Sequence, residues 1–412
     1  MTHLSINAER LIERLHRLGE IGRDEGGSLT RLAASDADGQ ARDVLANWVK
    51  AAGLDLSIDR LGNMFAIWRG AHGGDRAPVM IGSHIDTVVD AGIYDGCYGV
   101  LAGLEVVETL ASARFAPSRP IVVAAFTNEE GVRYTPDMMG SLVYAGGLDV
   151  DEALASIGVD GTVLGEELAR IGYAGTREPD FLRPRAYVEL HIEQGPILDC
   201  ERIPIGAVET LQGISWRRVT IEGCANHAGT TPMGERHDAL LAASKLVEAV
   251  REITTRTPGR QVGTVGRLQV FPNAPNVVPG LVKLSVEFRD LSADTVARLG
   301  NEVAARAKEI AEQTGTEISL ERIARDPPAL ADPKIQAQIE AAAASLDLKT
   351  MHLPSGAGHD AMVVARFMPA AMMFIPSIGG ISHDVRENTS DADIVFGCEV
   401  LADAVAEVRR QL

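Results

Sequence analysis

The chain has 412 residues, of which 46% are hydrophobic, and a formal net charge of −18 at pH 7. This length suffices for two domains with sizeable cores. The negative charge argues against nucleic acid or an anionic membrane as a partner, because both would repel the protein. It says little about a small substrate, which responds to the local field of a site.

Three further features place the chain in the cytoplasm. No apolar run reaches the about 18 residues that a membrane span requires. The first residues, Met1 to Ser5, lack the basic and then apolar pattern of a secretory signal. The four cysteines are scattered and form no CxxC pair, which is typical of reduced thiols. We therefore expect a cytoplasmic protein without a nucleic-acid or membrane partner.

Helix and strand patterns alternate through the first third of the chain. Apolar residues at helical spacing predict a helix over residues 7–18, and Ser35 or Asp36 could begin a second helix that stops at Gly53. A stretch that is apolar nearly all round, residues 99–110, predicts a buried helix. The predicted strands of this part are residues 56–58, 64–68, 79–81 and 121–126. The continuous apolar strands indicate a sheet covered on both faces, as in α/β folds.

Polar side chains follow the predicted strand at 79–81. His84 and Asp86 come directly after it, and Asp95 lies further on in a glycine-flanked loop. In open α/β sheets, ligands bind in the crevice at the carboxyl ends of the strands. Imidazole and carboxylate are ligands that zinc or manganese take. The stretch suggests half of a metal site, although taken alone it also fits a capping aspartate and a surface histidine.

The same kind of group recurs at three later strand ends. Glu129 and Glu130 follow the strand at 121–126, where one carboxylate could bind a metal while its neighbour takes a proton from water. His191 and His383 follow two further apolar strands. Those strands are residues 186–190 and 371–375. Each group alone also fits an acidic turn or a structural histidine, but together they predict a site for two cations about 3.5–4 Å apart.

The sequence lacks the motifs of serine hydrolases and of nucleotide-binding proteins. The sequence contains no GxSxG elbow of a serine hydrolase. It also contains neither the GxGxxG nor the GxxxxGK[ST] motif of nucleotide-binding proteins.

The pattern changes from about Gly213 to β-α-β-β-α-β, the ferredoxin-like arrangement. The expected strands and helices are 216–222, 236–253 (helix), 262–271, 282–288, 296–314 (helix) and 317–323. We expect an inserted domain over residues 213–329, with its exit near Asp326-Pro327-Pro328. The main domain would then consist of residues 1–212 and 330–412.

Seven stretches, taken in this order, resemble the hydantoinase/carbamoylase branch of the M20 metallopeptidase-like amidohydrolases. This branch includes N-carbamoyl-L-amino acid hydrolases, β-ureidopropionases and allantoate amidohydrolases. The stretches are GSHIDT at 82–87, YDG at 94–96, NEEG at 128–131, ELHIEQGP at 189–196, HAGTTP at 227–232, GAGHD at 356–360 and ISH at 381–383. The resemblance covers nearly the whole chain. It implies a mixed-sheet α/β/α catalytic domain with an inserted ferredoxin-like lid and dimerisation domain.

The resemblance also implies a set of metal ligands. His84 and His191 would hold one cation, Glu130 and His383 would hold the other, and Asp95 would bridge them. Zinc suits the imidazoles, and manganese, cobalt or nickel suit the mixed nitrogen and oxygen site nearly as well.

Catalytic and substrate-binding roles follow from the same resemblance. Glu129 would be the general base, and Asp86 would orient a ligand imidazole. His227 would steady the oxyanion, reaching the site from the other subunit of a homodimer, as in dimeric relatives. Asn276 and Arg289 would hold the substrate carboxylate. The remaining residues expected to line the site are Gln194, Gly356, Ala357 and Gly358.

The expected activity is hydrolysis of a linear amide or ureido C–N bond by a dinuclear metal enzyme. For N-carbamoyl-L-amino acids the products would be the amino acid, CO2 and ammonia. Alternatives are an allantoate amidohydrolase, another N-acyl-L-amino acid hydrolase and, from a different class, a non-catalytic binding protein that kept the fold. Val132-Arg133-Tyr134 departs from the Ser-Arg-Phe of many relatives, and we expect this departure to lie near the pocket.

Overall fold

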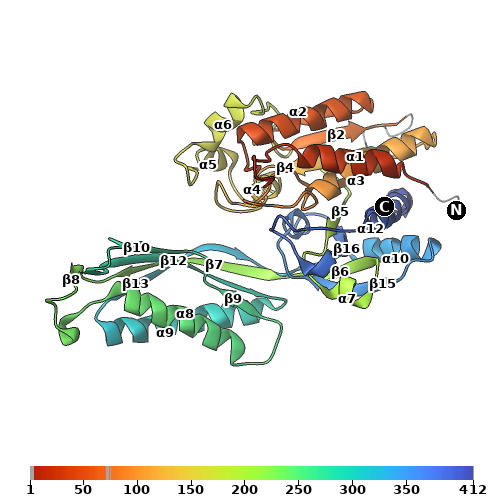
Figure 1. Ribbon diagram of the computed structural model, residues 1–412. Helices are drawn as coiled ribbons and strands as arrows, with labels where there is room; N and C mark the ends of the chain where they lie inside the picture. The colour runs from red at the N-terminus through yellow and green to blue at the C-terminus, as the bar shows by residue number, and fades with distance from the viewer. Residues whose placement is uncertain (1–3, 71–73, 75, 412) are drawn as a thin grey trace. The chain divides into compact units, whose positions relative to one another are not determined.

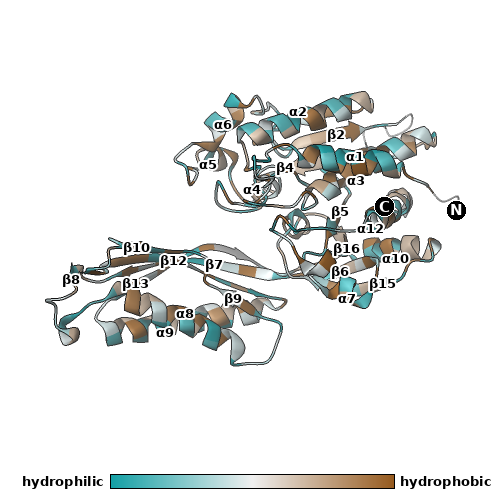
Figure 2. Cartoon of the chain, viewed as in Figure 1, coloured by the Kyte–Doolittle hydropathy of each residue, from teal (hydrophilic) through white to brown (hydrophobic). Residues whose placement is uncertain are grey.

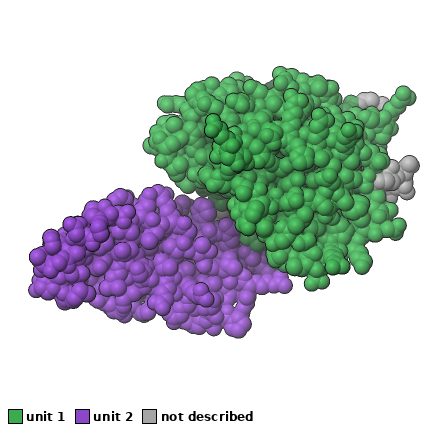
Figure 3. All heavy atoms as spheres, in the orientation of Figure 1, with its two compact units in different colours: residues 1–211, 329–412 green, residues 212–328 purple. Residues whose placement is uncertain are grey.

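The computed structural model describes residues 4–70, 74 and 76–411 (Figure 1). Met1 to His3, which entered the prediction about a secretory signal, lie outside the described residues. The chain divides into two compact units, Met1–Leu211 with Ala329–Leu412 and Gln212–Pro328, which Figure 3 colours separately. Among the described residues, no helix combines the length and the apolar character that crossing a membrane requires.

Unit 1 contains a nine-stranded mixed sheet, which confirms the predicted fold class. Its strand order is β1-β2-β4-β3-β5-β16-β6-β14, and β15 pairs with β6. The four central strands, from β4 to β16, run parallel, whereas their neighbours β2 and β6 are antiparallel to them. The strands are β1 Asp55–Ile58, β2 Met64–Trp68, β3 Val79–His84, β4 Ile121–Phe126, β5 Ala186–Ile192, β6 Ile205–Leu211, β14 Ala329–Leu330, β15 Thr350–Ser355 and β16 Ala370–Ile375.

Helices of unit 1 pack on this sheet around a large apolar core. Asn7 and Ser35 accept hydrogen bonds from main-chain N–H groups at the starts of α1 and α2, which confirms the predicted helix starts. The buried helix expected over 99–110 is α3, which packs against β3, β4 and β5. The helices are α1 Ala8–Gly19, α2 Asp36–Ala51, α3 Cys97–Ser112, α4 Met139–Tyr144, α5 Val150–Leu154, α6 Leu164–Arg170, α7 Ile197–Glu201, α10 Pro333–Ser345, α11 Asp360–Val364 and α12 Asp391–Gln411. Figure 2 shows α1 and α2 with hydrophilic and hydrophobic residues in alternation, as expected for helices with one face toward a core.

Unit 2 has the predicted β-α-β-β-α-β order, with an antiparallel sheet of order β10-β12-β7-β13 and β9 beside β12. Its main elements are β7 Gly213–Glu222, α8 Ala239–Thr255, β9 Val262–Thr264, β10 Leu268–Phe271, β12 Leu281–Asp290, α9 Ala293–Thr314 and β13 Glu317–Asp326. The prediction of one continuous strand over 262–271 is wrong, because this segment forms two strands, β9 and β10. Thr264 lies opposite Glu287 but Leu268 lies opposite Leu284, so one extra residue bulges out between them.

Candidate metal centre

The predicted metal ligands of unit 1 meet at the carboxyl ends of its central strands. His84 is the last residue of β3, and His191 lies one residue before the end of β5. The expected strand ends at residues 81 and 190 were therefore too early, and both imidazoles extend from the sheet itself. Potential ligand atoms within 4.8 Å of one another form three groups: His84, Asp95 and His191; His84, Glu129 and Glu130; and Asp95, Glu130 and His383.

Asp95 occupies the middle of this cluster. Its Oδ1 atom lies 3.1 Å from His191 Nε2 and 3.6 Å from His84 Nε2. Its Oδ2 atom lies 3.1 Å from His383 Nε2, and His383 Nε2 is also 3.6 Å from Glu130 Oε2. The two oxygens of one carboxylate thus face two different sets of ligands. A carboxylate that bridges two cations needs this arrangement.

Main-chain carbonyls orient two of the imidazoles. His84 Nδ1 lies 2.9 Å from the carbonyl oxygen of Asp86, and His191 Nδ1 lies 2.8 Å from that of Ile192. A carbonyl can only accept, so Nδ1 carries a hydrogen, and Nε2 is the nitrogen that faces the cluster and could bind a cation. Gly96 permits the close approach, since a Cβ there would lie 2.3 Å from His84 Nε2.

Asp86 contacts both His84 and the turn that carries the paired glutamates. Its Oδ1 atom is 3.8 Å from His84 Nδ1, too far for a hydrogen bond, so the carbonyl of Asp86 orients the ring instead. The two carboxylate oxygens accept hydrogen bonds from the main-chain N–H groups of Glu129 and Glu130, each at 3.3 Å. Asp86 therefore fixes the turn that presents the paired glutamates. Asn128 begins this turn in the left-handed region with a φ of 57°.

Burial and neighbouring charges perturb the acids of the cluster. Burial raises the pKa of Glu129 well above its usual range, and burial with the nearby Asp95 carboxylate raises the pKa of Glu130 to about 8. Burial also opposes ionisation of Asp95, but hydrogen bonds from His191, His383 and His84 hold its pKa well below the ordinary value. Among the described residues, Glu130 Oε1 is a buried oxygen without a hydrogen-bond partner. This unpartnered oxygen and the nitrogen and oxygen donors of the cluster fit two divalent cations.

Gln194 and the loop at 356–358 also belong to unit 1. Gln194 Nε2 donates to Asp95 Oδ2 at 2.7 Å, so its side chain contacts the proposed bridging carboxylate. The loop leads into α11, and the amide of Ala357 donates to Ser355 Oγ at 3.1 Å. The next side chain, His359, packs its ring on His191 with the centroids 4.5 Å apart. Sequence reasoning gave His359 no role, although it lies within the GAGHD stretch.

Three predicted site residues lie in unit 2. His227 is in the short strand β8 (Asn226–His227), which pairs with β11 (Val277–Val278), and the amide of Ala228 donates to the carbonyl of Asn276 at 3.0 Å. The His227 and Asn276 segments are therefore neighbours, and both lie beyond the Leu281 end of β12. Arg289 is near the opposite end of this strand, where it pairs with Glu287. A ten-residue strand spans about 30 Å. Within one copy of unit 2, Arg289 therefore lies far from His227 and Asn276.

Arg133 and Tyr134, in the stretch that departs from the relatives, have partners within unit 1, and their nearness to the substrate stays a prediction. The Arg133 side chain pairs with Asp160 and Glu167 at 2.9 and 2.8 Å. The Tyr134 hydroxyl lies 2.8 Å from Thr162 Oγ1. Both side chains therefore connect loops of unit 1 and have structural partners.

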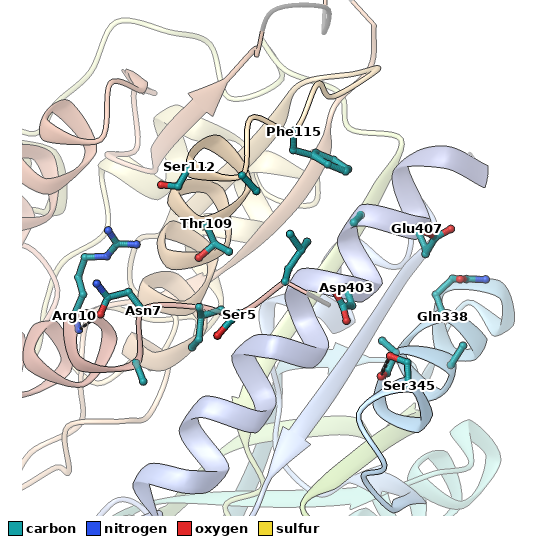
Figure 4. Close-up of a pocket in the computed structure, with 17 residues that line it drawn as sticks. Ser5, Asn7, Arg10, Thr109, Ser112, Phe115, Gln338, Ser345, Asp403 and Glu407 are labelled. Carbon is teal, nitrogen blue, oxygen red and sulfur yellow. Dashed lines mark hydrogen bonds between the residues drawn. The ribbon is translucent and has the colours of Figure 1, made fainter. Parts of the chain in front are cut away.

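A separate cavity of about 1250 Å³ lies elsewhere in unit 1 (Figure 4). It is lined by the segment that begins α1, the end of α3, and α10 and α12, for example by Ser5, Thr109, Gln338 and Asp403. None of the cluster residues lines it. The metal cluster thus lies at the carboxyl ends of the central strands and is distinct from this cavity.

Comparison with known proteins identifies the family. The family described as Peptidase family M20/M25/M40 matches residues 80–407. An N-carbamoyl-L-amino-acid amidohydrolase of Rhizobium meliloti is 38% identical over 402 residues, which cover 98% of this chain and 96% of the relative. A ureidoglycolate hydrolase of Arabidopsis thaliana is 35% identical over 98% of this chain and 87% of its own.

The solved structures agree. The crystal structure of an amidase of the hydantoinase/carbamoylase family from Burkholderia vietnamiensis superposes with a TM-score of 0.95. The two sequences are 40% identical, and the match covers 99% of this chain and 98% of the other. The resemblance inferred from the seven stretches is thereby confirmed, and the chain belongs to the M20/M25/M40 peptidase family.

Proposed function

We propose that this protein is a dinuclear metal-dependent amidohydrolase that cleaves N-carbamoyl-L-amino acids to the amino acid, CO2 and ammonia. The observation that carries the proposal is the Asp95 carboxylate, whose two oxygens face separate groups of metal-ligating side chains. Full-length relatives at 38% identity are named as amidohydrolases of such substrates. These relatives indicate a hydrolase of C–N bonds other than peptide bonds. Intact ligands argue against the alternative of a non-catalytic binding protein.

Glu129 is the candidate general base. Two divalent cations, when bound, supply positive charge that acidifies water and polarises the scissile carbonyl. Glu129 Oε2 lies 3.5 Å from His84 Nε2, at the edge of the cluster and within reach of a water there. Because burial raises the pKa of Glu129, the side chain can keep the proton that it takes from water and pass it to the leaving nitrogen.

Substrate binding is proposed to involve unit 2 as a lid. Arg289 presents a guanidinium fork that suits a substrate carboxylate. Since Arg289 lies about 30 Å along β12 from the segment that carries His227 and Asn276, one lid cannot bring all three to one substrate. We infer a homodimer in which the partner subunit's His227 and the partner subunit's Asn276 complete the site. The exposed edge strand β10, with Leu268 and Phe271 at its surface, supports pairing through the lid.

The names of the relatives point to more than one ureido acid as a substrate to test. A relative named ureidoglycolate hydrolase is 35% identical, close to the 38% of the N-carbamoyl-L-amino-acid amidohydrolase. Ureidoglycolate and allantoate therefore join N-carbamoyl, N-formyl and N-acetyl L-amino acids in the panel for metal-reconstituted protein. The protein should be reconstituted with zinc, manganese, cobalt and nickel in turn, and its activity compared. The four free thiols support the cytoplasm as the proposed location.

The decisive variant is Glu129→Gln. Removing a general base typically costs about 10²–10⁴-fold in rate, so we expect kcat to fall by at least about a thousandfold while both cations stay bound. Elemental analysis and steady-state kinetics measure the two quantities. Glu166→Gln, an exposed glutamate on α6, is the matched control and should keep full activity. Ordinary turnover in Glu129→Gln would refute the proposed mechanism.

A further inference from the structure

The ligand His383 is carried by a surface loop, unlike the strand-borne histidines. The loop runs from Ile378 to Asn388, and its ends are joined by a hydrogen bond from the Ile378 amide to the Asn388 carbonyl at 2.8 Å. The side chain of His383 is 49% exposed, whereas that of Asp95 is 5% exposed. Sheet pairing does not fix the position of this imidazole, so another contact must do so.

Glu387 supplies that contact. Among residues 378–388, all of which the structure describes, it alone is buried. Its Oε1 atom accepts hydrogen bonds from the amides of Tyr94 and Asp95 at 3.1 and 3.2 Å. Its Oε2 atom accepts from the hydroxyl of Ser382 at 2.7 Å, and this hydroxyl is also 3.3 Å from Asp95 Oδ2. One side chain therefore ties the His383 loop to the segment of the proposed bridging ligand.

The chemistry of Glu387 suits a position beside cations. Burying a carboxylate is costly unless its oxygens are paired. The three partners here are two main-chain N–H groups and a hydroxyl, which carry no charge. Hydrogen bonds to an ionised acceptor are stronger than neutral ones, and nearby cations would favour the ionised form. The three hydrogen bonds therefore connect the His383 loop to the Asp95 segment through one buried side chain.

We propose that Glu387 is the positioning residue of the second cation site, the one formed by Asp95, Glu130 and His383. It holds His383 against the bridging carboxylate, so the second cation binds tightly only while this brace is in place. Glu387 also holds the main chain of Asp95, which the first site shares, but His84 and His191 extend from the sheet, so the first ion should stay bound without Glu387. This inference rests on the proposed dinuclear function.

The test is a titration of the metal-free full-length protein with Mn²⁺ alone. The wild-type protein should bind two ions, with the electron paramagnetic resonance spectrum of a spin-coupled pair. In Glu387→Ala, loss of a residue that orients ligands should weaken the second site by about 10–100-fold. The first ion should bind with wild-type affinity and give the spectrum of an isolated ion. Glu387→Gln keeps an acceptor for the two amides. Its affinity for the second ion should therefore lie between those of the wild-type protein and Glu387→Ala.

Gly92→Ala tests the same brace without changing Glu387 itself. A Cβ at Gly92 would lie 2.3 Å from Glu387 Oε1 and would push the carboxylate aside. We expect the second ion to be weakened here as well, by at least tenfold in dissociation constant.

Glu105→Gln is the matched control. Glu105 is another fully buried carboxylate of unit 1, which accepts from the Asn7 amide, from Arg10 and from the Thr109 hydroxyl. This variant should lower the thermal midpoint of unfolding and still bind two ions. It separates a general loss of stability from a specific loss of the second site.

The outcomes are distinct. Two ions with wild-type affinities in Glu387→Ala would overturn the role of Glu387 and leave the dinuclear function standing. If Glu387→Ala does not fold, an unchanged second-site affinity in both Glu387→Gln and Gly92→Ala overturns it. Fewer than two ions in the wild-type protein would contradict the dinuclear function and, with it, this inference.

Discussion

The two halves of the metal cluster are built in different ways. His84 and His191 extend from parallel strands in the middle of the sheet, and their side chains are only 2% and 1% exposed. Glu130 follows a strand on a turn, and His383 lies on an exposed loop. Strand pairing fixes the first half, whereas hydrogen bonds from side chains fix the second. We infer that the first site is set by the fold and that the second can be lost separately.

Removing one histidine from each half should show the largest difference. His191→Ala should abolish the first site, and the second site, whose one nitrogen ligand lies on an exposed loop, should not hold an ion firmly alone. His383→Ala should keep one ion. Both variants should lose turnover by about a thousandfold or more if two cations act together. Elemental analysis after dialysis, with steady-state kinetics, measures the contrast. Loss of both ions from His383→Ala would show that the halves are not independent.

A smaller effect is expected from Arg289, which extends from strand β12. Hydrogen bonds between charged groups contribute about 1.5–3 kcal/mol, so Arg289→Ala should raise KM for carboxylate-bearing substrates by about 10–100-fold. The value of kcat should change less. Arg298→Ala, at an exposed position of helix α9, is the control and should leave KM as it is. An unchanged KM in Arg289→Ala would remove this residue from the substrate site.

A further prediction is a pH dependence of metal uptake. The hydrogen bond with Asp95 raises the pKa of His383 to about 9, so without metal this imidazole is protonated at pH 7. Because the pKa of His383 is raised, a cation that binds this imidazole below pH 9 must displace its proton. Affinity for the second ion should therefore fall by at least about tenfold per unit as the pH drops from 8 to 6, since Glu130, whose pKa is raised to about 8, must also lose a proton. Calorimetry in buffers of different ionisation enthalpy should detect proton release. No release at pH 7 would contradict this assignment.

Much of the fold and of the cluster was predictable from the sequence because short-range signals coincide with the sheet. Apolar runs such as residues 121–126 mark buried parallel strands, and polar groups after such runs must gather at one edge. The bulge between β9 and β10 was not predictable, since it depends on register with β12. Nor was the role of Glu387, whose partners Tyr94 and Asp95 are 293 and 292 positions away. Contacts between distant loops leave no periodic pattern.

The carbonyls of Asp86 and Ile192, which receive the Nδ1 hydrogens of His84 and His191, have a consequence for divergence among relatives. A carbonyl is present whatever side chain stands at its position. A substitution at Ile192 should therefore leave unchanged which nitrogen His191 offers, whereas at Asp86 it would keep the carbonyl but remove the carboxylate that holds the turn of Glu129 and Glu130. The main-chain contacts that orient His84 and His191 thus depend little on side-chain identity. Changes of metal preference within such proteins should therefore arise mainly in the loop that carries His383.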